Sequence, residues 1–182
     1  AKVDWNDFYP EAAEEKSPPH MPRPRGPAVT HTVYVDADHA GNILTRRSHT
    51  GIIHFINNAP ILWYSKRQTT VESSTFGSEF NALRIAVDQT VSMRYKLRMM
   101  GVRIDGPTYI LCDNKAVVIN SSRPESTLKK KHNQICFHRV REAVAAGICI
   151  VGHVDGNDNL ADLLTKVLTW VKRKRILSEL LW

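Results

Sequence analysis

The sequence predicts an α/β domain with a mixed five-stranded sheet and helices on both of its faces. Three observations lead to this prediction. Three β-rich runs follow one another between residues 32 and 65, a long helical pattern comes next, and two further β-rich runs alternate with helical patterns. This β-β-β-α-β-α-α-β-α order joins an antiparallel meander to crossover connections, so both parallel and antiparallel pairs are expected. A chain of 182 residues with 42% apolar residues is long enough for one such core.

The first 28 residues are expected to form an extended arm or linker. Six of the nine prolines fall in this stretch among charged residues, with almost no apolar period. We therefore place the folded domain at residues 29–168. Residues 169–182, which contain the run Lys172 to Arg175, are expected to form a basic terminal helix or tail.

The β-rich runs and the first helix have clear boundaries. The run 32–35 stops at Asp36, and the runs 51–56 and 61–65 are joined by the turn 57–60, which predicts an antiparallel hairpin. Apolar residues then recur at helical spacing from Phe76 until Gly101 ends the pattern. Glu79 lies at the edge of this apolar stripe, so its side chain is expected to angle toward the sheet.

The second half alternates short strands and helices. The run 108–112 is a buried-type strand that ends at Asp113, and helices are expected at 114–120 and 127–146. A last strand at 148–151 precedes a polar loop and a helix that carries Leu160 to Val167, with Asp162 in its first turns. Ligands of such sheets gather at the carboxyl ends of the strands, where Asp36 and Asp113 are placed.

Four acids, Asp36, Glu79, Asp113 and Asp162, are thus aimed at one region of the fold. Each has a simpler explanation alone: Asp36 as a turn residue, Asp113 as part of a helix cap, Glu79 as a solvated side chain, and Asp162 as a favourable charge near a helix start. If they converge, their repulsion requires a counter-charge, and a divalent metal is the simplest one.

Charge and cysteine content restrict the class of protein. Lys and Arg outnumber Asp and Glu by 25 to 18, which favours a polyanionic partner such as nucleic acid or an acidic membrane surface, although a merely basic surface is the alternative. Three cysteines without CxxC spacing favour neither a disulfide framework nor a zinc site and indicate a reducing, intracellular compartment. An apolar run long enough to span a membrane is absent from the sequence.

Six sequence blocks in a fixed order resemble a known family. They are YVDADHAG at 34–41, RRSHTG at 46–51, ILWYSK at 61–66, STFGSEF at 74–80, CDNK at 112–115 and LADLLTK at 160–166. Together they resemble the ribonuclease H domain of copia-type retrotransposon Pol polyproteins, over residues 32–168. The N-terminal arm resembles the connection that follows the reverse-transcriptase portion of such polyproteins.

The resemblance implies a ribonuclease H-like fold in which Asp36, Glu79, Asp113 and Asp162 are catalytic and hold two Mg²⁺ ions, with Mn²⁺ as a substitute. It implies cleavage of the RNA strand of RNA/DNA hybrids during reverse transcription, by two-metal hydrolysis. The implied partners are the hybrid and the reverse-transcriptase portion of the same polyprotein, without a membrane or a small-molecule cofactor. The implied location is the cytoplasm, within a virus-like particle.

Some assignments keep alternatives. Asp38 competes with Asp36 because residues i and i+2 of a strand point the same way, and it is otherwise a neighbour of the site. Many members of the family carry a loop histidine near the last acid, and the matching loop 154–159 has none. His153 and His132 are the candidate substitutes for proton transfer, although His132 also fits a packed position on its helix.

Basic and polar residues near the acids are the candidate contacts for nucleic-acid phosphates. This set comprises Arg46, Arg47, Ser48, Lys66, Arg67, Asn114, Lys129, Lys130 and Lys131. A solvated charged face is the alternative for Lys129 to Lys131, and Trp63 is expected in the core. Two other functions remain: a catalytically silent module of this fold that binds nucleic acid or acts as a scaffold in a larger reverse transcriptase, and a related transposase or integrase nuclease.

Overall fold

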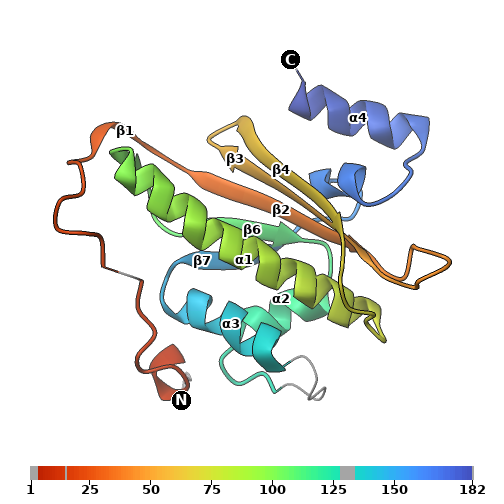
Figure 1. Ribbon diagram of the computed structural model, residues 1–182, viewed down its shortest axis with the longest axis horizontal. Helices are drawn as coiled ribbons and strands as arrows, with labels where there is room; N and C mark the ends of the chain where they lie inside the picture. The colour runs from red at the N-terminus through yellow and green to blue at the C-terminus, as the bar shows by residue number, and fades with distance from the viewer. Residues whose placement is uncertain (1–3, 15, 128–133, 182) are drawn as a thin grey trace.

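The protein is built on a five-stranded mixed sheet with the strand order β4-β3-β2-β6-β7 (Figure 1). The computed structural model describes residues 4–14, 16–127 and 134–181. The strands are β2 (His31–Asp38), β3 (His49–Ile56), β4 (Ala59–Arg67), β6 (Thr108–Cys112) and β7 (Cys149–His153). Strands β2, β3 and β4 form an antiparallel meander, and β6 and β7 continue the sheet in parallel with β2. The predicted mixed five-stranded sheet is confirmed.

One face of the sheet is covered by three helices, α1 (Thr75–Met99), α2 (Lys115–Ser122) and α3 (Gln134–Ala145). Ser74 caps α1 by accepting a hydrogen bond from the Gly77 amide at 3.2 Å, as its position before the apolar stripe predicts. The main core lies between these helices and the sheet, where Phe80, Leu83 and Ile110 are almost fully buried. Close packing of this face fixes α1, and with it Glu79, against the sheet.

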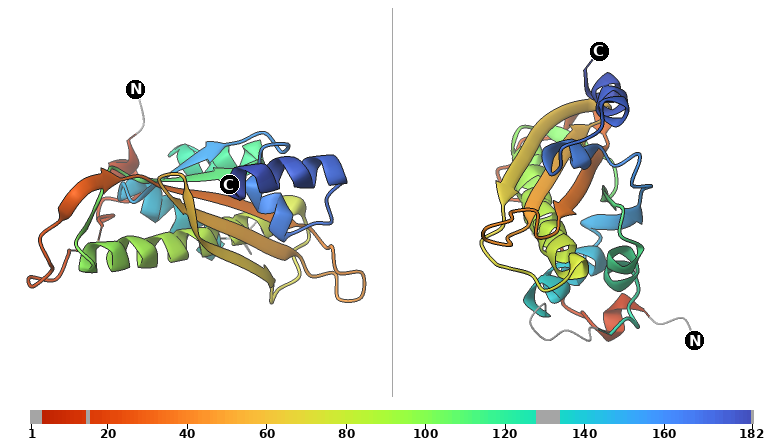
Figure 2. Two further views of the ribbon diagram at one scale, coloured as in Figure 1. Left: turned by 90° about the horizontal axis from the view of Figure 1, so that it is seen from above. Right: turned by 90° about the vertical axis from the view of Figure 1, so that its right-hand side faces the viewer.

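The opposite face is covered by η3 (Leu160–Leu164), a five-residue 3₁₀ helix, and by α4 (Trp170–Leu180) (Figure 2). Ile53 and Phe55 of β3 pack there with Leu160 and Ile176 in a second, smaller apolar cluster. Helices therefore cover both faces. The helix expected to continue to Val167 ends earlier, because the chain turns after η3 to reach α4 and leaves Val167 exposed.

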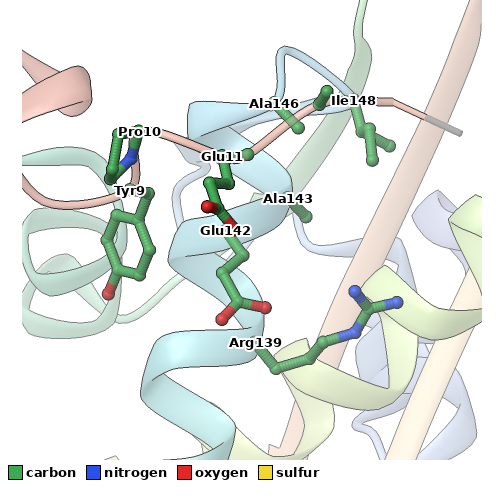
Figure 3. Close-up of a pocket in the computed structure, with 10 residues that line it drawn as sticks. Tyr9, Pro10, Glu11, Arg139, Glu142, Ala143, Ala146 and Ile148 are labelled. Atoms are coloured by element: carbon green, nitrogen blue, oxygen red, sulfur yellow. The ribbon is translucent and has the colours of Figure 1, made fainter.

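The N-terminal segment contacts the helical face rather than extending into solvent. It contains η1 (Trp5–Asp7) and β1 (Arg25–Val29), and β1 forms a parallel pair with β5 (Val102–Ile104) that the sequence did not predict. The Tyr9 hydroxyl lies 2.7 Å from Nδ1 of His138 on α3. Tyr9, Pro10 and Glu11 border a hollow of about 460 Å³ beside α3, with Arg139 across from them (Figure 3).

A chain of buried hydrogen bonds crosses the sheet beneath α1. His54 Nε2 donates to the Gln89 amide oxygen at 3.0 Å, so Nδ1 of its neutral ring accepts from His31 Nε2 at 3.1 Å. Nδ1 of His31 then accepts from the Thr108 hydroxyl at 3.0 Å, and that hydroxyl accepts from Arg94 at 3.3 Å. His54, His31 and Thr108 each donate one hydrogen bond and accept one along this chain, with both imidazoles neutral; Arg94 only donates and the Gln89 oxygen only accepts.

One core expectation is wrong. Trp63 was expected in the core, but its side chain is 68% exposed. It lies on β4, which is the edge strand of the sheet, and on the same face as Ile53, its partner in register on β3. That face is covered over β3 but left open over β4.

Candidate active site

Asp36 lies near the end of β2 with only 3% of its surface exposed. The strand continues to Asp38, so Asp36 lies within the sheet. The sequence pattern had placed it at the end of the strand. Its partner across the antiparallel pair is Gly51 of β3. The acid is therefore paired to β3 on one side, where Gly51 offers it no side chain, while the pairing of β2 with β6 ends two residues earlier, at Tyr34.

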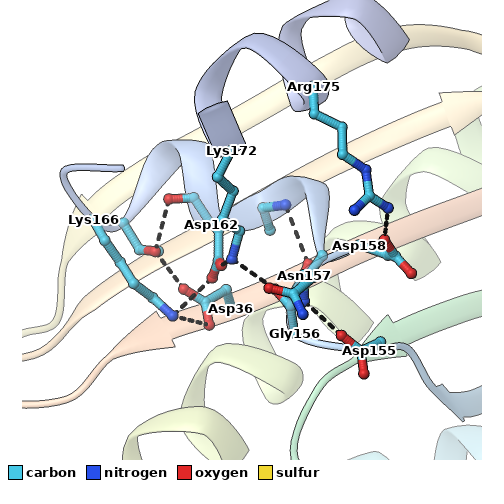
Figure 4. Close-up of polar contacts among 12 residues, drawn as sticks. Asp36, Asp155, Gly156, Asn157, Asp158, Asp162, Lys166, Lys172 and Arg175 are labelled. Atoms are coloured by element: carbon cyan, nitrogen blue, oxygen red, sulfur yellow. Dashed lines mark hydrogen bonds and ion pairs between the residues drawn. The ribbon is translucent and has the colours of Figure 1, made fainter. Parts of the chain in front are cut away.

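Gly51 allows η3 to lie directly on the sheet. A Cβ atom at this position would lie 2.8 Å from the carbonyl oxygen of Ala161 and 2.7 Å from Cγ2 of Thr165. Both distances are shorter than van der Waals contact, so only glycine permits this approach. The close packing brings Asp162 next to Asp36 (Figure 4), and the Thr165 hydroxyl within hydrogen-bonding reach of the same acid.

Asn159 anchors the start of η3 to the strand that carries Asp36. Its buried side chain donates to the carbonyl oxygen of Val35 at 3.0 Å and accepts from the amide of Ala161 at 3.2 Å. At the other end of η3, the Thr165 hydroxyl donates to a carboxylate oxygen of Asp36. Two side-chain contacts thus hold η3 in register with β2.

Three of the four predicted acids converge. Asp36, Asp113 and Asp162 each offer a carboxylate oxygen, and these three oxygens lie within 4.8 Å of one another. Two full charges at this separation repel by about 3 kcal/mol at an effective dielectric constant of about 20. A cluster of this kind is stable only with protons, ammonium groups or a metal ion nearby.

Glu79 faces the same region from α1, and burial raises its pKa to about 7. A hydrogen bond from the Asn114 side chain lowers this pKa, while the charges of Asp113 and Asp36 raise it further. Asn114 also caps α2, because its side-chain oxygen accepts from the amides of Ala116 and Val117 at 2.9 and 3.3 Å. Oε2 of Glu79 is buried and has no hydrogen-bond partner among the described residues.

The other acids differ in charge state. Burial raises the pKa of Asp36 to about 6, against the opposing effect of the Thr165 hydroxyl and the Lys166 ammonium. Burial also raises the pKa of Asp162, but hydrogen bonds from Lys166 and Lys172 outweigh it and leave that pKa below the ordinary value. Asp162 is therefore a carboxylate at neutral pH, whereas Asp36, with a pKa of about 6, becomes protonated just below neutral pH.

The donor set fits a divalent cation such as Mg²⁺ or Mn²⁺. All four candidate ligands are carboxylates, the oxygen donors that these ions prefer. The unpartnered Oε2 of Glu79 is a buried acceptor that a cation would satisfy. The clustered oxygens of Asp36, Asp113 and Asp162 are a second feature that a positive ion would stabilise.

The alternative residues near the acids occupy different positions. The carboxylate of Asp38 lies over Gly41, at the start of the loop after β2, and is outside the three-acid cluster. His153 is exposed, and its Nε2 lies 3.2 Å from the backbone carbonyl oxygen of Asp113, so it is near the site without facing a carboxylate. His132 lies outside the described residues.

The candidate phosphate contacts do not lie together, and Asn114 is the one that caps α2 and hydrogen-bonds to Glu79. Arg47, Lys66 and Arg67 border a hollow of about 520 Å³, and a smaller one joins Arg47 and Arg67 to Asp38 and Thr165 at the acidic site. Arg46, which precedes Arg47 in the loop between β2 and β3, is exposed. Ser48 is fully buried and accepts from the Ala40 amide at 3.2 Å, so it supports the loop and does not face a ligand. Lys129, Lys130 and Lys131 lie outside the described residues.

Sequence reasoning missed the residues that hold the acids in place. These are Gly51, Asn159, Thr165, Lys166 and Lys172. Thr165 and Lys166 directly follow η3, which carries Asp162, and Asn159 directly precedes it, so proximity in sequence was the available signal. Lys172 gave no signal, because its contact with Asp162 depends on the path of the chain into α4.

Comparison with solved structures establishes the fold. The N-terminal RNase H domain of Rv2228c from Mycobacterium tuberculosis matches with a TM-score of 0.59 at 15% identity, covering 76% of this chain and 91% of that one. LC11-RNase H1, solved in complex with an RNA/DNA hybrid, also matches with a TM-score of 0.59, at 16% identity, covering 75% and 94%. The protein is therefore a domain of the ribonuclease H fold.

Comparison with curated proteins places the chain more closely. It is 32% identical over 145 residues to the retrovirus-related Pol polyprotein from transposon RE1 of Arabidopsis thaliana, covering 80% of this chain. The chain spans about a tenth of the length of that relative. A scan against protein-family models found no match. The chain thus combines the ribonuclease H fold with similarity to part of a copia-type Pol polyprotein, which fits a ribonuclease H domain of such a polyprotein, as the six blocks indicated.

Proposed function

We propose that this domain hydrolyses the RNA strand of RNA/DNA hybrids during retrotransposon reverse transcription. The observation that carries the proposal is the convergence of Asp36, Asp113 and Asp162, with the unpartnered Oε2 atom of Glu79 beside them. The fold and the Pol relatives support this nuclease assignment. The reverse-transcriptase portion of the same polyprotein is the proposed partner, and the cytoplasm, within a virus-like particle, is the proposed location.

The four carboxylates would hold two Mg²⁺ ions, with Mn²⁺ as a substitute. When bound, such ions activate a water molecule for attack on the phosphodiester and stabilise the leaving oxygen. Asp36 is the central ligand, since its carboxylate lies between the elements that carry Asp113 and Asp162. Asn114 holds Glu79 from the side through its hydrogen bond, and Thr165 fixes the orientation of Asp36.

The nucleic acid is proposed to lie across the open side of the acids and along the ends of β3 and β4. Arg47, Lys66 and Arg67 gather there beside the acidic site and would contact phosphates without reading base sequence. Such contacts would position the hybrid for cleavage anywhere along its length. In the part of the chain that the structure describes, none of the helices has the length and apolar character needed to cross a bilayer.

The test is cleavage of a labelled RNA strand in a hybrid, with Mg²⁺ or Mn²⁺, by the chain and by Asp113→Asn. We expect cleavage by the parent chain and loss of at least about 100-fold in the variant, since a ligand is lost without a change in side-chain size. Asp105→Asn, an exposed acid next to β5, is the matched control and should cleave normally.

Three outcomes would contradict the proposal. Equal cleavage by the parent chain and Asp113→Asn would show that the acids are not the active site. Tight hybrid binding without metal-dependent cleavage would identify a silent binding module. Cleavage of DNA ends in preference to hybrids would identify a transposase or integrase nuclease.

A further inference from the structure

Lys166 lies at the acidic site with its ammonium group between two of the acids. Its Nζ is 2.7 Å from Oδ1 of Asp162 and 3.4 Å from Oδ1 of Asp36 (Figure 4). Its side chain is 38% exposed, while the side chains of the two aspartates are almost fully buried. A single, partly exposed ammonium group thus contacts both buried carboxylates.

Lys172 contacts the same site in a different way. It comes from α4, contacts the other oxygen of Asp162, and donates to the carbonyl oxygen of Gly156 at 2.7 Å. Arg175, one turn further along α4, pairs with Asp158. Two basic residues of α4 therefore contact the loop 154–159. Lys172 is therefore held by its helix and by a backbone acceptor, whereas Lys166 contacts only the acids in the interactions described.

The charge balance of the site gives Lys166 a role that changes with occupancy. The clustered carboxylates need positive charge, and Lys166 supplies it when no metal is bound. A divalent ion among the same oxygens repels the ammonium, because like charges within about 5 Å disfavour each other strongly in a partly buried site. The flexible, partly exposed lysine side chain can then reach another anion at the mouth of the site.

We propose that Lys166 is the resident counter-ion of the acidic site, that a bound divalent ion displaces it, and that its ammonium then pairs with a phosphate of the nucleic-acid substrate. This inference rests on the proposed function of the site. It predicts opposite effects of removing the charge: metal binding becomes stronger, and hybrid cleavage becomes weaker. A residue that only supported the fold would weaken both.

The first experiment measures Mn²⁺ binding by calorimetry in the absence of nucleic acid. Lys166→Met should bind Mn²⁺ about tenfold more tightly than the parent chain, since the ion no longer has to displace a charge. Lys166→Arg should bind like the parent. Lys174→Met removes the same charge from an exposed position on α4 and should leave the affinity unchanged. Unchanged or weaker binding by Lys166→Met would overturn the counter-ion role.

The second experiment measures hybrid cleavage at saturating Mn²⁺. Lys166→Met should lose about tenfold in kcat/KM, and Lys166→Arg should retain most of it. Normal cleavage by Lys166→Met would overturn the phosphate contact. If circular dichroism shows that Lys166→Met does not fold, Lys166→Gln takes its place. If the parent chain binds Mn²⁺ and cleaves the hybrid, and Lys166→Met behaves like it in both assays, only the inference about Lys166 is refuted. If the parent chain neither binds Mn²⁺ nor cleaves the hybrid, the proposed function is refuted as well.

Discussion

Gly51→Ala tests whether the close approach of η3 to the sheet builds the active site. The added Cβ would lie 2.7 Å from Cγ2 of Thr165, 2.8 Å from the carbonyl oxygen of Ala161 and 3.0 Å from Cβ of Leu164. Ordinary contact begins near 3.4 Å, so these atoms have to retreat by about 0.7 Å. Two of the three belong to backbone or to a Cβ, so η3 itself must move away from β3.

The displacement affects stability and chemistry by different amounts. Overpacking of this kind costs about 1–3 kcal/mol, from which the reduced entropy of the unfolded chain removes about 0.5–1 kcal/mol. Because η3 carries Asp162 and precedes Thr165, the shift also moves Asp162 away from Asp36. A misplacement approaching 1 Å lowers turnover by on the order of 10- to 100-fold.

Urea unfolding and hybrid cleavage by the same preparations separate these two effects. Gly152→Ala is the matched control, because its Cβ would meet only the end of the flexible Leu111 side chain, at 3.1 Å. It should stay close to the parent chain in both assays. A Gly51→Ala protein with the stability and cleavage rate of the parent would refute the view that this glycine positions η3.

Three further predictions concern titration and hydrogen bonding. Burial, and after it electrostatic interactions with His54 and Arg94, lower the pKa of His31 to about 3. Between pH 6.5 and 3 the unfolded chain therefore binds more protons than the folded one. As the pH falls through this range, the free energy of unfolding should decrease by up to about 1.4 kcal/mol per pH unit, measured by urea unfolding. The raised pKa values of Asp36 and Glu79 predict that Mn²⁺ binding releases protons at pH 6 and hardly any at pH 8, measured by calorimetry in buffers of different ionisation enthalpy. Thr165→Val should raise the pKa of Asp36 further and move the acid limb of the cleavage profile to higher pH; an unchanged limb would contradict the hydrogen-bond role.

The parts of the fold that sequence predicted are those with a strong local period. The antiparallel meander, α1 and β6, which ends just before Asp113, follow from apolar alternation or helical spacing within one segment. The β1–β5 pair did not follow, because β1 contains Gly26 and Pro27 and is held by pairing with a distant three-residue strand. Trp63 shows a second limit: alternation assigns a residue to a face but does not say whether another element covers that face.

The site shows the same division between local pattern and distant contact. Asp36 and Asp113 were predicted at the ends of β-rich runs, Glu79 at the border of an apolar stripe and Asp162 in the first turns of a helical pattern. These are properties of their own segments. The contacts that hold them were not predictable. Two of them join segments far apart in the sequence, Asn159 to Val35 and Thr165 to Asp36, and the contact of Lys172 with Asp162 depends on the path of the chain into α4. Spacing identifies the ligands of such a site, whereas tertiary packing determines what surrounds them.

The structure explains how the fold keeps several acidic side chains close together. The residues from Asn159 to Lys172 supply an anchor to β2, an acid, a hydroxyl for Asp36 and two ammonium groups for Asp162. The same segment thus supplies part of the negative charge and the positive charge that offsets it. Burial raises the pKa values of Asp36 and Glu79, which receive less of this compensation, whereas at Asp162 the hydrogen bonds from Lys166 and Lys172 outweigh burial and lower the pKa. The carboxylates with the least compensation therefore lie on the β2 and α1 side of the site.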